Sequence, residues 1–249
     1  MSGNGGRFMQ SSKQRAVIIG GSSGMGLATA RKLLDEGMHV TIVGRGEDRL
    51  RQAAEKLHSE HLETEPLDIS DQTAVVAYFS KAKQFHHLIL SVGVSVNCMG
   101  NFKDVDLSLI AQGIQNKVIW QLIVLQAALP KMYDDGSVTF ITAESARHAA
   151  PGASGPSAIN GALEATIPTL ARELGPIRVN GVSPGLIDTP RWHNLPEEQR
   201  NKLFNEFATS LPVGHIGDAD DVATCIVMLT RNRYISGSII ECDGGAHTL

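Results

Sequence analysis

A glycine-rich segment near the start of the chain has the residue types and spacing needed to bind a diphosphate. It spans residues 20–26 (GGSSGMG), follows a β-branched run at residues 15–19 and precedes an amphipathic segment. Gly20 would let the strand turn sharply, Gly24 would let the backbone approach a diphosphate, and Gly26 would let the helix pack closely on the strand. The free N–H groups at the helix N-terminus would then face the phosphates. Turns also need glycine, so the prediction depends on the strand before the segment and the helix after it.

The end of the second expected strand indicates which dinucleotide would bind. NAD-selective proteins usually place a carboxylate here, which accepts a hydrogen bond from the ribose 2′-hydroxyl. Gly44 supplies no carboxylate, whereas Arg45 offers a planar cation suited to a 2′-phosphate. Arg49, one helical turn later, would add positive charge. The alternative is that Arg45 is a solvated surface arginine with no ligand. The sequence favours NADP(H) over NAD(H) as the cofactor.

Length and composition indicate one soluble globular domain. The chain has 249 residues, of which 42% are hydrophobic and 19% charged, and its net charge is −4. These values exclude a disordered or fibrous chain and disfavour a nucleic-acid or anionic-membrane partner. No run of about 18 apolar residues suggests a membrane span. Cys98, Cys225 and Cys242 have no metal-ligand spacing, so we expect reduced core thiols in a cytoplasmic protein and no bound metal.

The elements that would position these residues alternate between strands and helices. Residues 1–14 are polar and are expected to form a flexible arm, followed by a single domain over residues 15–249. We expect strands at 15–19, 40–43, 62–66, 87–91, 137–142, 178–182 and 238–241, and helices up to residue 36 and at 47–58, 107–131 and 156–174. This alternation predicts an α/β, Rossmann-like, doubly wound parallel sheet of about seven strands with helices on both faces. Ligands of such sheets bind beyond the carboxyl ends of the strands.

Several motifs along residues 13–249 match one known family. The segment 19–26 reads IGGSSGMG where the family has TGxxxGxG, so Ile19 replaces a threonine. Asp68 and Ile69 match the family's Asp-apolar pair, and Asn116 matches the asparagine of its long central helix. Two further matches are the sixth strand with its Pro-Gly turn and the last strand, which read RVNGVSPGLIDTP (178–190) and SGSIIECDGG (236–245). On these residues the chain resembles the short-chain dehydrogenase/reductase family.

The resemblance implies a set of cofactor contacts. In the family the Asp-apolar pair contacts adenine, and the positions of Ile187 and Thr189 meet the nicotinamide amide and the diphosphate. The expected cofactor-binding residues are Gly20, Ser22, Ser23, Gly24, Met25, Arg45, Asp68, Ile69, Gly93, Asn160, Pro184, Gly185, Ile187 and Thr189. The family's last strand packs across a tetramer axis, so the resemblance also implies a homo-oligomer, tetramer or dimer, acting on a small molecule.

The family's catalytic residues are missing from this chain. Its serine, tyrosine and lysine fall at Ala143, Pro156 and Asn160, and of its NNAG strand end only Gly93 is kept. None of the three tyrosines of the chain lies near the helix at 156–174 or precedes a lysine by four positions. In the family the tyrosine protonates the carbonyl oxygen as hydride arrives, and a positioned acid is worth about 10²–10⁴ in rate. An ordinary ketone would therefore be reduced very poorly.

Substitutes for these groups are sought in the loop at residues 142–148. If the chain stays extended there, Ser145 faces the same way as Ala143 and would present a hydroxyl to a substrate oxygen. His148 is a candidate for proton transfer near neutral pH, and Glu144 is the next candidate. The alternatives are a loop-capping role for Ser145 and plain surface positions for His148 and Glu144.

Three residues of the expected central helix have side chains that could take part in the site or in packing. Asn116 is a candidate site residue, with a backbone-bridging role as the alternative. Lys117 is expected to pack or pair at a subunit face, and Trp120 to lie in the core or at an interface.

Residues 189–211 are expected to form a mobile substrate lid whose apolar lining is Pro190, Trp192, Leu195 and Phe204. The function indicated is NADPH-dependent reduction of a small, mostly apolar, activated acceptor, imine-like or a conjugated carbonyl. One alternative is a catalytically inactive NADP(H)-binding protein that acts as a sensor or hetero-oligomer partner. Another is a protein that shapes a reactive intermediate without redox change.

Overall fold

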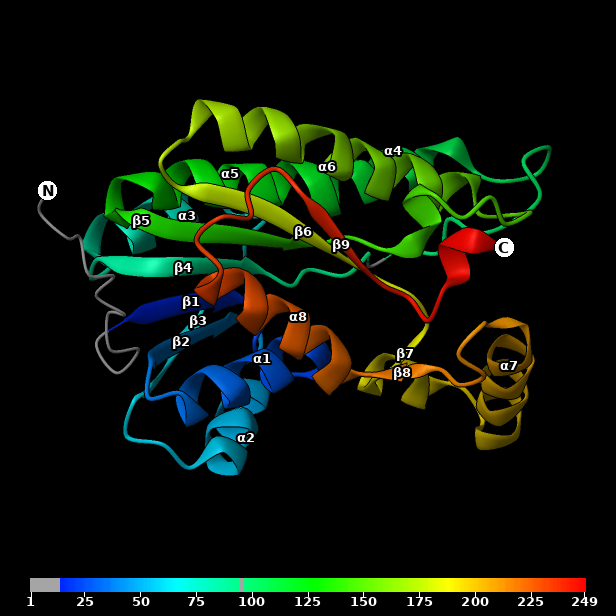
Figure 1. Cartoon of the computed structure of the whole chain (residues 1–249), viewed down its shortest axis with the longest axis horizontal. Helices are drawn as coiled ribbons and strands as arrows, with labels where there is room; N and C mark the ends of the chain where they lie inside the picture. The colour runs from blue at the N-terminus through cyan, green and yellow to red at the C-terminus, as the bar shows by residue number, and fades with distance from the viewer. Residues whose placement is uncertain (1–13, 95) are drawn as a thin grey trace, which may run out of the picture.

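The core of the molecule is a seven-stranded parallel sheet (Figure 1). The computed structural model describes residues 14–94 and 96–249, so the predicted arm, apart from Gln14, lies outside the described residues. The strands run in the order β3-β2-β1-β4-β5-β6-β9. Their bounds are β1 Arg15–Ile19, β2 His39–Gly44, β3 Leu62–Pro66, β4 Phe85–Leu90, β5 Met132–Ile141, β6 Arg178–Pro184 and β9 Ile239–Cys242. The predicted fold class is confirmed.

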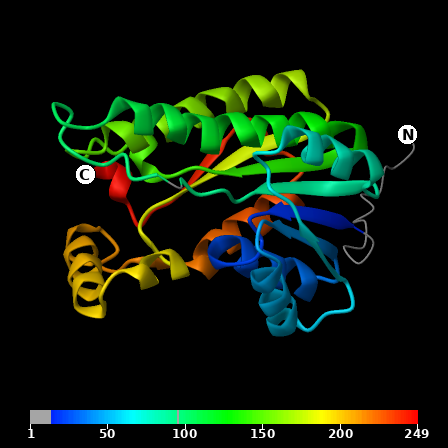
Figure 2. The same ribbon diagram turned by 180° about the vertical axis from the view of Figure 1, so that it is seen from behind.

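Helices cover both faces of the sheet, as seen from the front and from behind (Figures 1 and 2). One face carries α3 (Gln72–Lys81), α4 (Leu107–Ile114), α5 (Trp120–Ala128) and α6 (Ser154–Glu173). The opposite face carries α1 (Gly24–Asp35), α2 (Glu47–Leu57) and α8 (Ala219–Arg231). A smaller outlying unit consists of the strand pair β7 (Ile187–Asp188) and β8 (Gly217–Asp218) with α7 (Glu197–Ser210).

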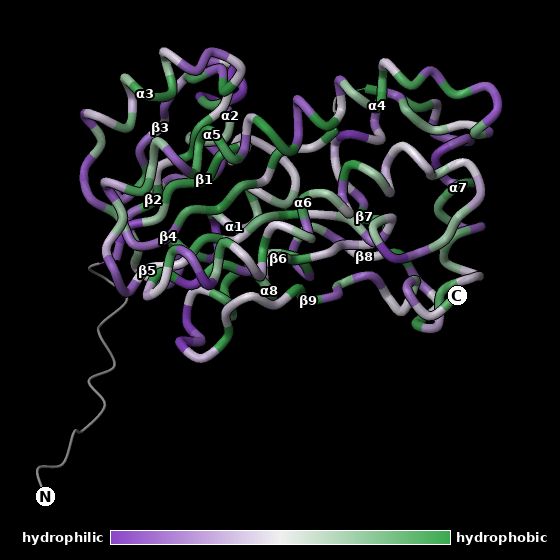
Figure 3. The backbone as a smooth tube through the Cα atoms, turned by 90° about the horizontal axis from the view of Figure 1, so that it is seen from above, coloured by the Kyte–Doolittle hydropathy of each residue, from purple (hydrophilic) through white to green (hydrophobic). Residues whose placement is uncertain are grey.

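The strands form because consecutive side chains enter two different hydrophobic cores. In β1, Val17 and Ile19 pack into the core under α3, α5 and α6, whereas Ala16 and Ile18 pack into the core under α1, α2 and α8. Side chains alternate between the two faces of a strand, so a strand buried on both faces is apolar throughout. The hydropathy colouring shows this as green tubes through the centre of the molecule (Figure 3).

The order of the strands reverses between β1 and β4. β1 pairs with β2 on one side and with β4 on the other, with Ile19 opposite both Val43 and Leu90. The loops that leave β1 and β4 therefore diverge to opposite faces and open a crevice at their carboxyl ends. The sequence predicts that ligands bind at this crevice, beyond the carboxyl ends of the strands.

The structure differs from the sequence prediction mainly in its helices. α3, α7 and α8 were not predicted, and the expected single helix at 107–131 is interrupted by a π turn, η2, at Gln115–Ile119. β5 begins at Met132 rather than at residue 137, because Met132 already pairs with Phe85 before the register shifts. Within residues 14–94 and 96–249, no helix has both the length and the apolar character of a membrane span.

Two of the three cysteines, distant in the sequence, meet in the structure. Cys225 in α8 and Cys242 at the end of β9 are both half-buried free thiols. A thiol–thiol hydrogen bond from Cys242 lowers the pKa of Cys225 to about 7. The structure thus brings Cys225 and Cys242 into contact, which their separation in the sequence did not indicate.

A buried histidine in β4 gives a pH dependence of stability. His87 is 1% exposed, and its Nδ1 lies 2.9 Å from Ser137 Oγ. Burial, with the charges of His86 and Arg178, lowers its pKa to about 3. Between pH 6.5 and 3 the unfolded chain binds a proton that the folded chain rejects. We therefore expect the free energy of unfolding to fall with decreasing pH in this window, by up to about 1.4 kcal/mol per pH unit from this residue.

Urea unfolding at a series of pH values measures this slope. The variant His87→Phe is expected to show a flatter dependence than the wild type, whatever its absolute stability. His193→Gln, at an exposed histidine, is the matched control and should keep the wild-type slope. Equal slopes for His87→Phe and the wild type would contradict the assignment.

Candidate active site

The glycine-rich loop joins β1 to α1 at the crevice. Gly20 has φ +83°, and a side chain there would strike the carbonyl oxygen of Ser91 at the end of β4. A side chain at Gly26 would strike the carbonyl of Gly20, so the helix start lies directly on the loop. Among the described contacts, Ser23 at the N-cap makes no side-chain capping bond. The N–H groups of the first turn of α1 are therefore available to an anionic ligand.

A cavity of about 330 Å³ opens along this loop and continues past the ends of β2 and β4. Ten of the fourteen expected cofactor residues line it: Gly20, Ser22, Ser23, Gly24, Met25, Arg45, Asp68, Ile69, Gly93 and Thr189. Arg49 lines it beside Arg45. One elongated cavity thus joins the loop, the arginine pair and the end of β4.

Four of the expected cofactor residues do not line this cavity. Ile187 is 5% exposed and packs in the core, with its carbonyl accepting a hydrogen bond from Trp192 Nε1 at 3.0 Å. Gly185 lies against the backbone of Asp243, and Pro184 belongs to the buried strand β6. Asn160 is 3% exposed in α6.

Several lining residues escaped the sequence analysis, and Trp120 and Arg191 are the two that bear on the chemistry. Trp120 lines the cavity, although it was expected in the core or at an interface. It lies four residues after Asn116, which also lines the cavity, and residues four apart share a helix face, so a signal was present. Arg191 lines the cavity directly after the Thr-Pro pair, and its guanidinium lies next to Gly93.

The central helix turns Lys117, rather than Asn116, toward α6. Lys117 is 4% exposed, and its Nζ donates to Asn160 Oδ1 at 2.7 Å and to the carbonyl of Thr142 at 3.2 Å. The expectation that Lys117 pairs at a subunit face is therefore wrong. The cause is the π turn, which inserts an extra residue per turn and rotates the helix register at this point.

The Lys117 ammonium is destabilised by its surroundings. Burial and then the positive charge of Arg191 lower its pKa to about 8, while Glu144 and Glu164 act in the opposite direction. The side chain is thus still mostly protonated at neutral pH.

The loop after β5 does not stay extended. Residues Glu144–Ala146 form a 3-10 turn, so the expected path that aligned Ser145 with Ala143 is wrong. The turn packs on α6, and the Ser145 hydroxyl accepts a hydrogen bond from Asn160 Nδ2 at 3.0 Å. The same Nδ2 donates to the carbonyl of Pro156 at 3.0 Å. Ser145, Asn160 and Lys117 thus form one hydrogen-bonded chain.

The two titratable candidates of this loop have different environments. Burial, with a smaller contribution from Asp243, raises the pKa of Glu144 to about 7. The carboxyl group is therefore half protonated near neutral pH. His148 is half-buried; its backbone N–H donates to the carbonyl of Glu144, and its carbonyl accepts from the N–H of Ala150. None of Glu144, Ser145 and His148 is among the residues that line the cavity.

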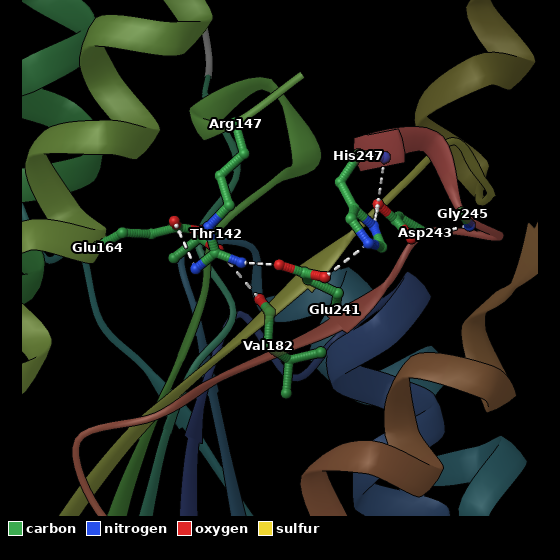
Figure 4. A network of polar contacts seen from close by, with 8 residues as sticks. All are labelled: Thr142, Arg147, Glu164, Val182, Glu241, Asp243, Gly245 and His247. Carbon is green, nitrogen blue, oxygen red and sulfur yellow. Dashed lines mark hydrogen bonds and ion pairs between the residues drawn. The ribbon is translucent and has the colours of Figure 1, made fainter. Parts of the chain in front are cut away.

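A network of charged groups fixes the neighbouring C-terminal segment (Figure 4). Arg147 pairs with Glu164 of α6 at 3.1 Å and with Glu241 of β9. His247 bonds Glu241 through Nε2 at 3.0 Å and Asp243 through Nδ1 at 2.8 Å. Thr142, whose carbonyl binds Lys117, donates its hydroxyl to Glu164 at 2.7 Å. The network therefore holds the end of β5, α6 and β9 together behind the Lys117 cluster.

Comparisons with known proteins agree with this architecture. The family model described as enoyl-(acyl carrier protein) reductase matches residues 20–247. The 3-oxoacyl-[acyl-carrier-protein] reductase of Bos taurus is 30% identical over 240 residues, covering 92% of this chain and 96% of that protein. The 3alpha-hydroxysteroid dehydrogenase of Mediterraneibacter gnavus is 25% identical, covering 97% of this chain and 100% of that protein.

The solved structures point the same way. A small-chain dehydrogenase in complex with NADPH superposes with a TM-score of 0.83 at 30% identity, covering 95% of this chain and 100% of that chain. The match to the family model includes the glycine-rich loop and the C-terminal strand. The chain belongs to the short-chain dehydrogenase/reductase family of oxidoreductases.

Proposed function

We propose that the protein is an NADPH-dependent reductase of activated acceptors, such as iminium ions or conjugated carbonyls, rather than of simple ketones. The observation that carries this proposal is the contrast within one site. The cavity keeps the phosphate loop and the arginine pair, whereas Ala143 and Pro156 offer no polar side chain where the family has its serine and tyrosine.

The residues present fit a phosphorylated dinucleotide. The N–H groups at the start of α1 would hold the diphosphate, and Arg45 with Arg49 would hold the 2′-phosphate. The relative solved with NADPH supports this choice of cofactor. NADPH, when bound, supplies a hydride.

The proposed class of acceptor follows from the acidic groups that the chain can offer to a substrate. An iminium ion already carries a positive charge and needs no proton before hydride arrives. A conjugated carbonyl takes its proton late, from water or from a group of moderate acidity. Glu144, whose burial raises its pKa to about 7, is the candidate acid for this class, and the Ser145 hydroxyl is the candidate donor to a substrate oxygen.

The segment expected to form the lid contributes Thr189, Pro190 and the cationic Arg191 to the cavity. Of its four expected apolar lining residues, Pro190 lines the cavity, whereas Trp192, Leu195 and Phe204 do not. Trp192 in η5 (Pro190–Asn194) meets Phe204 of α7 edge to face at 6.3 Å between ring centroids. We propose that residues 189–211 close over the bound acceptor. We also expect a homo-oligomer, a dimer or a tetramer, as for other members of the family.

Stopped-flow measurement of NADPH oxidation with cyclic iminium ions, enones and ketones tests the proposal. We expect turnover of the first two classes, with simple ketones slower by about 10²–10⁴. Enone reduction should decline as pH rises through about 7, since Glu144 loses its proton there. The isosteric variant Glu144→Gln should abolish this pH dependence and leave iminium reduction unchanged.

A non-catalytic NADP(H)-binding protein is the second candidate. It is favoured by the engagement of Asn160, whose Oδ1 accepts from Lys117 and whose Nδ2 donates to Ser145 and Pro156. Tight NADPH binding with no turnover of any acceptor class would contradict the reductase and support this second function.

A further inference from the structure

Lys117 is a buried cation for which the proposed reaction so far has no use. Its side chain reaches from the central helix to Asn160, the position where the family carries its lysine. The amide oxygen of Asn160 and the carbonyl of Thr142 accept two of the three ammonium N–H groups. Among residues 14–94 and 96–249 no acceptor is found for the third. In this contact the charge comes from the central helix, and the carboxamide comes from α6.

A second cation stands near Lys117. Arg191 lines the cavity from the lid side, with its guanidinium next to Gly93 at the end of β4. It is close enough to act on the charge of Lys117. Asn116, the residue before Lys117, also lines the cavity, whereas Lys117 itself is buried and is not among the lining residues. Lys117 therefore lies behind the cavity wall next to Asn116, whereas Arg191 forms part of the wall.

We propose that Lys117, anchored by Asn160, supplies the positive charge that position 160 no longer carries, and that with Arg191 it selects the reduced cofactor over the oxidised one. This inference rests on the proposed use of NADP(H). If the 2′-phosphate lies at Arg45, the nicotinamide ring lies at the opposite end of the cavity. The oxidised ring carries a positive charge and the reduced ring is neutral, so two nearby cations disfavour the oxidised form alone. The site is thereby set for reduction and for release of the oxidised product.

The charged groups around Lys117 determine the pH range in which it is protonated and can favour NADPH. Arg191 of η5 opposes protonation of the lysine, while Glu144 of the 3-10 turn and Glu164 of α6 favour it. The pKa of Lys117, lowered by burial to about 8, keeps it charged at pH 7. The preference should therefore fade as pH rises through about 8.

Calorimetric titration with NADPH and with NADP⁺, without any acceptor, measures the preference directly. At pH 7 we expect the wild type to bind NADPH about tenfold more tightly than NADP⁺. Lys117→Met, which keeps the length of the side chain and removes the charge, should reduce this ratio by about fivefold or more, mainly by tighter NADP⁺ binding. Arg191→Met should reduce the ratio partly. Lys103→Met, at an exposed lysine outside the cavity lining, is the matched control and should leave it unchanged.

An exchange variant separates the charge from a merely structural contact. Lys117→Asn combined with Asn160→Lys returns the ammonium to α6 and keeps one amide and one amine in contact. It should restore most of the ratio that Lys117→Asn alone loses, and circular dichroism and thermal unfolding establish that each variant is folded.

The outcomes distinguish this inference from the proposed function. A ratio that Lys117→Met leaves unchanged, or one that the exchange does not restore, would overturn the role of Lys117 even if the wild type turns over iminium ions. A shifted ratio without turnover would support the role of Lys117 and overturn the reductase. Absence of binding for both cofactor forms would overturn both.

Discussion

Replacing Arg45 with alanine is expected to weaken NADPH binding by about 10- to 100-fold and to leave NADH binding within about twofold. Arg45 and Arg49 line the cavity where β2 ends, and Gly44 offers no carboxylate to a ribose hydroxyl. A charge-assisted contact to phosphate contributes about 1.5–3 kcal/mol. Only the 2′-phosphate of NADPH makes this contact, so the loss should be specific for the phosphorylated cofactor. Titration of both reduced cofactors, followed by ligand fluorescence, measures it.

Arg51→Ala is the matched control for this experiment. Arg51 lies in α2, as Arg49 does, is exposed and pairs with Asp48 at 2.6 Å, but it does not line the cavity. Its removal should change neither affinity. Equal losses for NADPH and NADH in Arg45→Ala would show that the arginine does not read the 2′-phosphate.

Restoring the family's catalytic residues is expected to raise the rate of simple ketone reduction by about 10²-fold or more. The variant combines Ala143→Ser, Pro156→Tyr and Asn160→Lys, and it also needs Lys117→Asn. Lys117 Nζ lies 2.7 Å from Asn160 Oδ1, so two lysines at these positions would repel each other. Pro156 is the third residue of α6, where proline is tolerated but not required, so tyrosine fits the backbone. A positioned phenol is worth about 10²–10⁴ in rate.

NADPH consumption with a cyclic ketone, measured at saturating cofactor, tests this gain of function. The same variant with Pro156→Phe is the control, because it matches the ring and removes only the hydroxyl. A folded, NADPH-binding tyrosine variant that reduces ketones no faster than its phenylalanine control would contradict the placement of the family's tyrosine at position 156.

The helix around Lys117 shows where sequence reasoning reached its limit. Helical periodicity predicted one helix over residues 107–131, and an uninterrupted helix gives no reason to turn Lys117 inward. The π turn at Gln115–Ile119 changes the register, and hydrogen bonds to α6 and to the end of β5 stabilise the buried ammonium. Those partners are 25 and 43 residues away in the chain, so a local pattern does not reveal them.

The loop after β5 shows the same limit on a smaller scale. The residue types at 144 and 145 identified the right neighbourhood, but the extended path assumed for it was wrong. A 3-10 turn packed on α6 gives Ser145 its partner and leaves Glu144 half-buried. The raised pKa of Glu144 follows from that burial and not from the residue itself.

The sequence alone determined the sheet, its two helical layers and the loop at the end of β1. These features depend on local periods, on apolar strands and on glycines, which physical chemistry restricts to few conformations. The tertiary structure alone decided which partners the cationic side chains meet, namely Asn160 for Lys117 and the neighbourhood of Gly93 for Arg191. Their positions depend on desolvation and on contacts between distant elements, and these energies exist only once the chain has folded.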